Sequence, residues 1–438
     1  MSEYIFSNIQ NNKQQFKTDK MKVPAILFSS ERNFEKSDVL EKIEKLSQNK
    51  EVFHHIAVSS EAHTRAEIEN PTGSIIASSK ILPEMLDAAP NCGMRVLLTD
   101  ISENEIDKKK LKGLLENIEN NILSKELIGT KISLKTVLDI FQNGSGSLLE
   151  KNEIKNEREN SLSQGNFFLN KKISKEEILE AIPKIIFYLA KYRIGLLGEK
   201  KSHFIHFMKV SSIENNDLAE KIGLKKNQYL FFMHTGSSIV GRYTASLYTK
   251  RKVRKKMQKI ILLIIKLLSG FSSKKVSQKN IDTAFRAVGN YGFANRTILS
   301  QEIEKVLEKT FERKVSLSLL YDAPHVYFEK ENHFNQEVII HRNGSNRAFG
   351  PKRMASHSIF SKTGEPVLIA PFAKKVAYIC VGNDENEETF FSANHEIGKI
   401  KHLEIPQNKE EEYAEKIIRE MEKNKIIKLV AKLKPVKF

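Results

Sequence analysis

The chain has 438 residues, of which 40% are hydrophobic, and its 71 Lys and Arg against 54 Asp and Glu leave a formal net charge of +17. This composition is that of a globular protein, with length enough for one large core or two smaller ones. The longest apolar run, residues 260–268, is interrupted by Lys266 and is shorter than the roughly 20 residues that cross a bilayer. The polar opening segment has no signal-peptide pattern, so we expect a cytoplasmic protein with no membrane partner.

In chain order, the polar residues 1–21 predict a flexible tail, and residues 22–438 predict a single mixed domain. Helical periodicity is found in residues 38–50 and 103–141, with a short strand at 56–60. The polar stretch 143–166 predicts a mobile insertion, or else a boundary between two domains. Further along, four short apolar segments predict strands: 228–234, 315–321, 337–341 and 376–382. The fold class is therefore α+β, with mixed sheets flanked by helices.

The positive charge favours a polyanionic partner, because phosphates neutralised by Lys and Arg release counterions. The densest basic cluster, residues 250–259 (KRKVRKKMQK), leads directly into the apolar run. It predicts the start of a helix whose end faces phosphate, with a solvated helix face as the alternative.

Cysteine and histidine are the candidate metal ligands of the chain. The two cysteines, Cys92 and Cys380, are far apart, so each is a core thiol or a reactive or ligating one. Several histidines stand at the ends of apolar segments beside turn residues: His203, His234, His325, His341 and His395. Thiolate and imidazole together suit a divalent transition metal, whereas each histidine taken singly is more often structural.

Eight motifs occur in an order that resembles the RtcB-type RNA-splicing ligases, over most of the chain. They are NCGMR (91–95), LGEKKSHFIHF (197–207), HTGSSIVG (234–241), YGFANR (291–296), YDAPHV (321–326), HRNGSNRAFGP (341–351), NHEIGK (394–399) and VAKLKPVKF (430–438). The resemblance implies a single RtcB-like α+β domain around a metal cleft. It also implies a GTP-dependent ligase that joins RNA 3′-phosphate or 2′,3′-cyclic phosphate ends to 5′-hydroxyl ends.

The same resemblance assigns roles to individual residues. Cys92, His203, His234 and His325 match metal ligands, and manganese is the usual metal. His395 matches the histidine that forms a covalent histidine–GMP intermediate. The nucleotide-binding positions are Lys437, Tyr413, Ser202, His206 and Gly398. Candidate RNA-binding cations are Arg342, Arg347, Lys374 and Lys375.

Several positions depart from the family pattern. Ala89 stands where the family has an aspartate ligand, so we expect one tightly bound metal ion and a weaker second one. His206 replaces a glutamate in the nucleotide pocket, and bulky Phe372 and Ile397 replace small residues. Three hypotheses follow: a GTP-dependent ligase of broken RNA, a metal-dependent RNA end-processing enzyme that uses no nucleotide, and a non-catalytic RNA-end binder. The resemblance also implies an archease-like activating protein as a partner.

Overall fold

The computed structural model describes residues 5–9, 13–29, 38–65, 68–86, 89–169, 171–198, 202–249, 256–269, 271, 276–398 and 405–437. The chain forms two compact units. The first comprises residues 1–87, 213–222 and 325–434, and the second comprises residues 88–212, 223–324 and 435–438. Both contain helices and sheets, which confirms the α+β class.

The larger sheet of the first unit has seven strands in the order β1-β2-β3-β4-β5-β11-β10. Its strands are β1 (Ile5–Ile9), β2 (Lys13–Lys17), β3 (Ala25–Phe28), β4 (Val52–His63), β5 (Thr72–Ser78), β10 (Val326–His333) and β11 (Gln336–Asn343). All neighbours are antiparallel except β3 and β4. Helix α1 (Val39–Ser47) supplies the crossover that this parallel pair requires.

A second layer of the first unit pairs β13 (Pro366–Phe372), β14 (Val376–Gly382) and β16 (Ile427–Pro435), all antiparallel. Helix α12 (Glu410–Lys423) buries Ala414, Ile417, Ile418 and Met421, whose spacing makes one apolar helix face. These residues join the hydrophobic core of this unit. The remaining elements are β12 (Ser345–Arg347), β15 (Ser392–Asn394), α7 (Asn216–Lys221), η2 (Pro83–Met85), η8 (Glu387–Thr389) and η9 (Gln407–Lys409).

In the second unit the strands run in the order β7-β8-β6-β9, all antiparallel. They are β6 (Gly93–Thr99), β7 (Phe204–Ile213), β8 (Tyr229–Thr235) and β9 (Leu317–Pro324). The helices are α2 (Lys108–Ile118), α3 (Leu134–Asn143), α4 (Lys151–Glu159), α5 (Lys175–Ala181), α6 (Lys184–Arg193), α8 (Ser238–Tyr248), α9 (Lys256–Ser269) and α10 (Gln278–Phe311). Short helical turns are η3 (Glu103–Glu105), η4 (Glu119–Leu123), η5 (Gly144–Leu148) and η6 (Leu162–Gly165).

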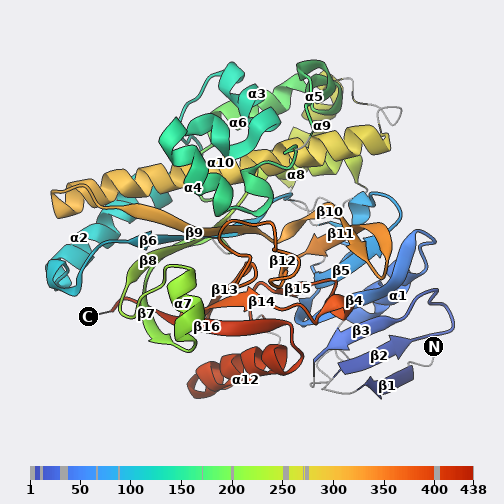
Figure 1. Ribbon diagram of the computed structural model, residues 1–438. Coiled ribbons are helices and arrows are strands. Elements are labelled where there is room, and N and C mark those ends of the chain that lie inside the picture. The colour runs from blue at the N-terminus through green and yellow to red at the C-terminus, as the bar shows by residue number, and fades with distance from the viewer. Residues whose placement is uncertain are drawn as a thin grey trace. The chain divides into compact units, whose positions relative to one another are not determined.

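Helix α10 organises the second unit. It is 34 residues long, and nearly every side chain between Ile281 and Leu299 is buried. Helices α2, α3, α5 and α8 pack along it (Figure 1). A helix that is buried on all sides tolerates glycine where a neighbour approaches closely. At Gly292 an added Cβ would lie 2.7 Å from the backbone oxygen of Asn91, so this glycine lets the loop before β6 touch the helix.

The four apolar segments predicted as strands lie in β8, β9, β11 and β14, and the helix predicted at 38–50 contains α1. Two other expectations differ from the structure. Residues 5–9 and 13–17 of the predicted tail form β1 and β2, because Phe16 is buried in the sheet. The predicted insertion 143–166 contains α4 and two short turns, because its polar residue Glu157 is buried in an ion pair with Arg95.

Across the described residues, none of the helices combines the length and apolar character needed to cross a membrane.

Candidate metal centre and nucleophilic histidine

Strand register in the second unit places Cys92, His203 and His234 at one edge of the sheet, and His325 is the next residue after the last strand of that sheet. Gly93 at the start of β6 pairs with Thr235 on one side and with Pro324 on the other. Cys92 precedes Gly93, His234 precedes Thr235, and His325 follows Pro324. Phe204, the residue after His203, pairs with His234. Four residues scattered over more than 230 positions therefore stand at neighbouring strand ends.

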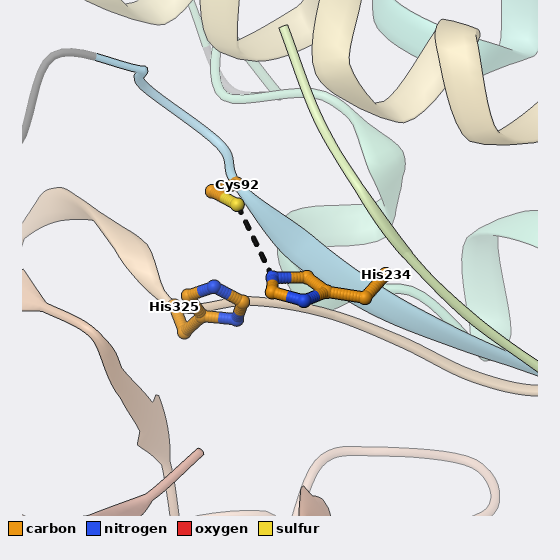
Figure 2. Close-up of side chains that lie close together, drawn as sticks. All are labelled: Cys92, His234 and His325. Carbon is orange, nitrogen blue, oxygen red and sulfur yellow. Dashed lines mark hydrogen bonds between the residues drawn. The ribbon is translucent and has the colours of Figure 1, made fainter. Parts of the chain in front are cut away.

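The ligating atoms of these side chains lie close together. The Sγ atom of Cys92 is 3.4 Å from Nε2 of His203 and 3.3 Å from Nε2 of His234. Cys92, His234 and His325 each offer one ligand atom, and these atoms lie within 4.8 Å of one another. Figure 2 shows their side chains directed toward one another, with the contact between Cys92 and His234 dashed. We call Cys92, His203, His234 and His325 the Cys–His group.

The spacing fits a bound metal ion. Two ligands of one tetrahedral ion, held at about 2.3 Å by sulfur and about 2.0–2.1 Å by nitrogen, are about 3.6 Å apart. The two sulfur–nitrogen distances observed here, 3.4 and 3.3 Å, are shorter than this by only a few tenths of an ångström. The donor set of one thiolate and several imidazoles is also the one that divalent transition metals prefer.

A second set of contacts orients His203. Its Nδ1 atom lies 2.8 Å from the carbonyl oxygen of Leu197, which also accepts a 2.6 Å hydrogen bond from the Thr235 hydroxyl. A carbonyl accepts but cannot donate, so the proton sits on Nδ1 and the Nε2 lone pair is free to ligate. Gly198 follows at φ +90, and an added Cβ there would meet His203 Nδ1 at 3.0 Å. In this motif Leu197 therefore orients the His203 ring through its carbonyl oxygen, and Gly198 leaves space for that ring.

Helix α10 holds the ends of β6 and β8 through Arg296. Its guanidinium donates to the carbonyl oxygens of Asn91 (3.2 Å) and Thr235 (2.8 Å) and to Oδ1 of Asn91 (2.8 Å). Asn91 and Thr235 are the chain neighbours of Cys92 and His234. The charge of Arg296 is balanced by the fully buried carboxylate of Asp322, at 2.6 Å and 2.9 Å. Asp322 also accepts from Arg95 at 2.9 Å.

In the first unit, His395 is paired with a buried carboxylate that the sequence did not indicate. Its Nδ1 atom lies 3.0 Å from Oε2 of Glu61, which is on β4. Glu61 also accepts hydrogen bonds from the backbone N–H groups of His395 (2.9 Å) and Glu396 (2.8 Å). Glu61, His395 and Glu396 also offer ligand atoms within 4.8 Å of one another. Nothing local in the sequence marks Glu61, because three histidines and two serines share β4 with it.

The pairing changes the acid–base properties of both groups. Burial raises the pKa of Glu61, although the nearby imidazole opposes that shift. Burial works against charge on His395, but the Glu61 carboxylate outweighs it and raises the pKa of the imidazole above 6.5. With the Nδ1 proton directed at Glu61, Nε2 carries the lone pair and is more basic than in an isolated histidine.

His395 also lies beside a member of the Cys–His group. The ring centroids of His325 and His395 are 4.4 Å apart. The backbone N–H of Gly344 donates to the carbonyl oxygen of His325 at 2.7 Å. Gly344 has φ +73, and an added Cβ would lie 3.2 Å from Cε1 of His395. The glycine of the HRNGSN motif therefore leaves room for the imidazole.

The predicted nucleotide-binding residues are divided between the units. In the second unit Ser202 is exposed, the His206 ring stacks on Phe204 at 4.4 Å, and Lys437 is exposed. The backbone N–H of Val436, the residue before Lys437, donates to the carbonyl oxygen of Phe207, the residue after His206. The two nucleotide-binding candidates Lys437 and His206 therefore lie on neighbouring segments.

In the first unit, Gly398 has φ +129, and Tyr413 lines a hollow of about 610 Å³ along α12. Phe372 and Ile397, which replace small residues of the family pattern, are both buried in the hydrophobic core of this unit. Ala89 is in the turn that leads to Cys92, where its carbonyl oxygen accepts the backbone N–H of that cysteine.

The RNA-binding candidates have different surroundings. Arg342 is fully buried and pairs with Glu331, and Arg347 pairs with Glu365 at 2.9 Å, so both guanidiniums are committed inside the first unit. This differs from the RNA-facing position that the sequence indicated. Lys374 is exposed, whereas Lys375 pairs with Glu410 at 2.9 Å. Residues 250–255 of the basic cluster lie outside the described residues, and Lys256 and Lys259 are exposed on α9.

The chain is an α+β protein with a Cys–His group that could hold a metal ion and, in the first unit, a histidine paired with a buried carboxylate. The family described as tRNA-splicing ligase RtcB matches residues 42–436, and the chain belongs to this family.

Curated relatives agree with that membership. A tRNA-splicing ligase RtcB of Nanoarchaeum equitans is 27% identical over 410 residues, covering 87% of this chain and 81% of the relative. One from Pyrococcus furiosus is 25% identical over 391 residues, covering 85% of this chain but 37% of the relative. The chain therefore spans well under half of the length of some relatives that it matches.

Proposed function

We propose that the protein is a GTP-dependent RNA ligase that joins a 3′-phosphate or 2′,3′-cyclic phosphate end to a 5′-hydroxyl end. The observation that carries the proposal is His395, whose Nδ1 atom faces Glu61 and whose ring lies 4.4 Å from His325. A histidine with its proton held on one nitrogen presents the other as a nucleophile. Membership of the RtcB family supports a ligase of RNA.

In the proposed reaction, Nε2 of His395 attacks the α-phosphate of GTP. The N–P bond forms as the bond to the pyrophosphate oxygen breaks, which leaves GMP on the histidine. The proton stays on Nδ1, facing Glu61, and the Glu61 carboxylate stabilises the positive charge that develops on the imidazole during this step. The guanylate then passes to the RNA 3′-phosphate, and the 5′-hydroxyl of the second strand displaces GMP to form the phosphodiester.

The Cys–His group would hold Mn²⁺, which would neutralise phosphate charge during transfer. The contacts of Cys92 with both His203 and His234 support a joint role of these three side chains as ligands. Because Ala89 provides no carboxylate, we propose one tightly bound ion and a weaker second one. Lys374, Lys437, Ser202, His206, Gly398 and Tyr413 remain the proposed contacts to RNA and nucleotide.

The test is covalent labelling with α-³²P-GTP and Mn²⁺, followed by denaturing electrophoresis. We expect an acid-labile label on the wild-type chain and on the His54→Ala variant, which changes an exposed histidine, and none on His395→Ala. Addition of RNA with a 3′-phosphate should discharge the label and yield joined product. We also propose a cytoplasmic location and an archease-like protein as a partner. Addition of that partner should increase the number of turnovers without changing the labelled residue.

The other two hypotheses predict different results in the same assay. Altered RNA ends without any label would establish nucleotide-independent end processing. RNA binding with neither label nor altered ends would establish a non-catalytic binder. Label that persists in His395→Ala would refute the assignment of the nucleophile.

A further inference from the structure

Helix α9 has apolar side chains on two opposite faces. One face carries Ile265, which is 1% exposed, together with the partly buried Ile261 and Leu262. Just after the helix, Phe271 lies 5.2 Å from the ring of Tyr248 on α8. Helix α9 also packs beside α6 and α8, so its inner face is anchored on the second unit.

The opposite face exposes a continuous set of large apolar side chains. Its exposed members are Met257 (67%), Ile260 (44%), Leu263 (57%), Ile264 (44%), Leu267 (72%) and Leu268 (73%). At 100° per residue these positions fall within an arc of about 140°, over a helix about 21 Å long. We call these six residues the α9 outer face. A helix that is apolar on both sides is normally covered on both sides.

Basic residues accompany this face in the sequence. Between residues 250 and 275 the sequence has ten Lys and Arg and no Asp or Glu. Lys256, Lys259 and Lys266 are exposed on α9 itself. Exposed leucines and isoleucines flanked by lysines are the composition of helices that lie in the interface of an anionic bilayer.

We propose that the α9 outer face binds the surface of an anionic lipid bilayer, with α9 lying parallel to the membrane plane. A helix can bind a bilayer surface through one face alone, and the inner face of α9 is already packed against the second unit. RNA would match the lysines but not the six apolar side chains. A second copy of this chain would bring the exposed lysines of one α9 helix, Lys256, Lys259 and Lys266, against those of the other, and each copy has a net charge of +17. This proposal differs from the expectation of no membrane partner and is independent of the proposed ligase activity.

The test is co-sedimentation of the full chain with vesicles of phosphatidylcholine alone or with added phosphatidylserine. We expect binding to the anionic vesicles, and a loss of about tenfold or more in Leu263→Glu/Leu267→Glu, because two exposed apolar side chains are removed from the interface. The matched control is Leu127→Glu/Ile128→Glu, which makes the same charge change at two other exposed apolar residues, 75% and 65% exposed. We expect this control to bind like the wild type.

A third variant, Lys256→Ala/Lys259→Ala, should weaken binding to anionic vesicles and reduce its dependence on salt. All variants should retain the wild-type circular dichroism spectrum, because the changed residues are exposed. Equal binding to both vesicle types, or equal losses in the two double-glutamate variants, would overturn the proposal. Concentration-dependent self-association that is lost in Leu263→Glu/Leu267→Glu, without vesicle binding, would instead assign the face to a second copy.

Discussion

The guanidinium of Arg296 is the group whose replacement tests most directly how the Cys–His group is held. It donates to five acceptor atoms: both carboxylate oxygens of Asp322, the carbonyl oxygens of Asn91 and Thr235, and Oδ1 of Asn91. The conservative variant Arg296→Lys keeps the charge but has only three donors. Oδ2 of Asp322 keeps its hydrogen bond from Arg95, so at least one of the other four buried acceptors loses its partner. Each such loss costs about 1–3 kcal/mol, so the free energy of unfolding should fall by at least about 1–3 kcal/mol.

The effect on metal binding is the specific part of this prediction. Because Asn91 and Thr235 adjoin Cys92 and His234, loosening them should weaken Mn²⁺ or Zn²⁺ affinity by about 10- to 100-fold. Chemical denaturation measures the first quantity and calorimetric metal titration of the folded variant measures the second.

Arg342→Lys is the matched control. Arg342 is also fully buried, and it donates to Ser392, to both Glu331 oxygens and to the Phe390 carbonyl oxygen. Oε2 of Glu331 also has a hydrogen bond with His333, and the Phe390 carbonyl oxygen also accepts from Ser392. The three donors of lysine can therefore leave every acceptor with a partner, so we expect a smaller loss of unfolding free energy than in Arg296→Lys. Metal affinity should be unchanged. If Arg296→Lys is destabilised but binds metal within about twofold of the wild type, the positioning role of Arg296 is refuted, since outer contacts typically matter by tenfold or more.

Three further predictions concern the thiol, the buried carboxylate and a buried imidazole. Cys92→Ser should lower metal affinity by about tenfold or more in calorimetric titration, whereas Cys380→Ala, which changes the buried thiol, should leave it unaltered. Glu61→Gln should slow GMP labelling by about 10²-fold. Because the carboxylate raises the pKa of His395, the pH at which the labelling rate rises should be lower in this variant, and an unshifted pH–rate profile would contradict this. Burial lowers the pKa of His341 from 6.5 to about 4, and its Nε2 accepts the Leu82 N–H, so the unfolded state binds more protons between these values. The free energy of unfolding should therefore fall by up to about 3 kcal/mol as pH falls from 6.5 to 4, and denaturation curves of His341→Gln should show a smaller fall.

Local pattern determined much of the fold. Short apolar segments predicted β8, β9, β11 and β14, and helical period predicted α1, because alternation and periodicity report which face of an element is buried. The order of eight motifs was enough to predict the family. The polar composition of 143–166 predicted mobility, although burial of Glu157 against Arg95 makes this segment part of the packed unit.

The candidate site was likewise predicted only in part from the sequence. The candidate ligands, one cysteine and several histidines, were predicted from the sequence with the help of the motifs. Their convergence is decided by register, since Gly93 pairs with both Thr235 and Pro324. The partnership of Glu61 with His395, 334 positions later, and the burial of Arg342 likewise had no local sign. Sequence pattern reports how each residue faces its own strand or helix, whereas its partners are set by which distant strands pair and in what register.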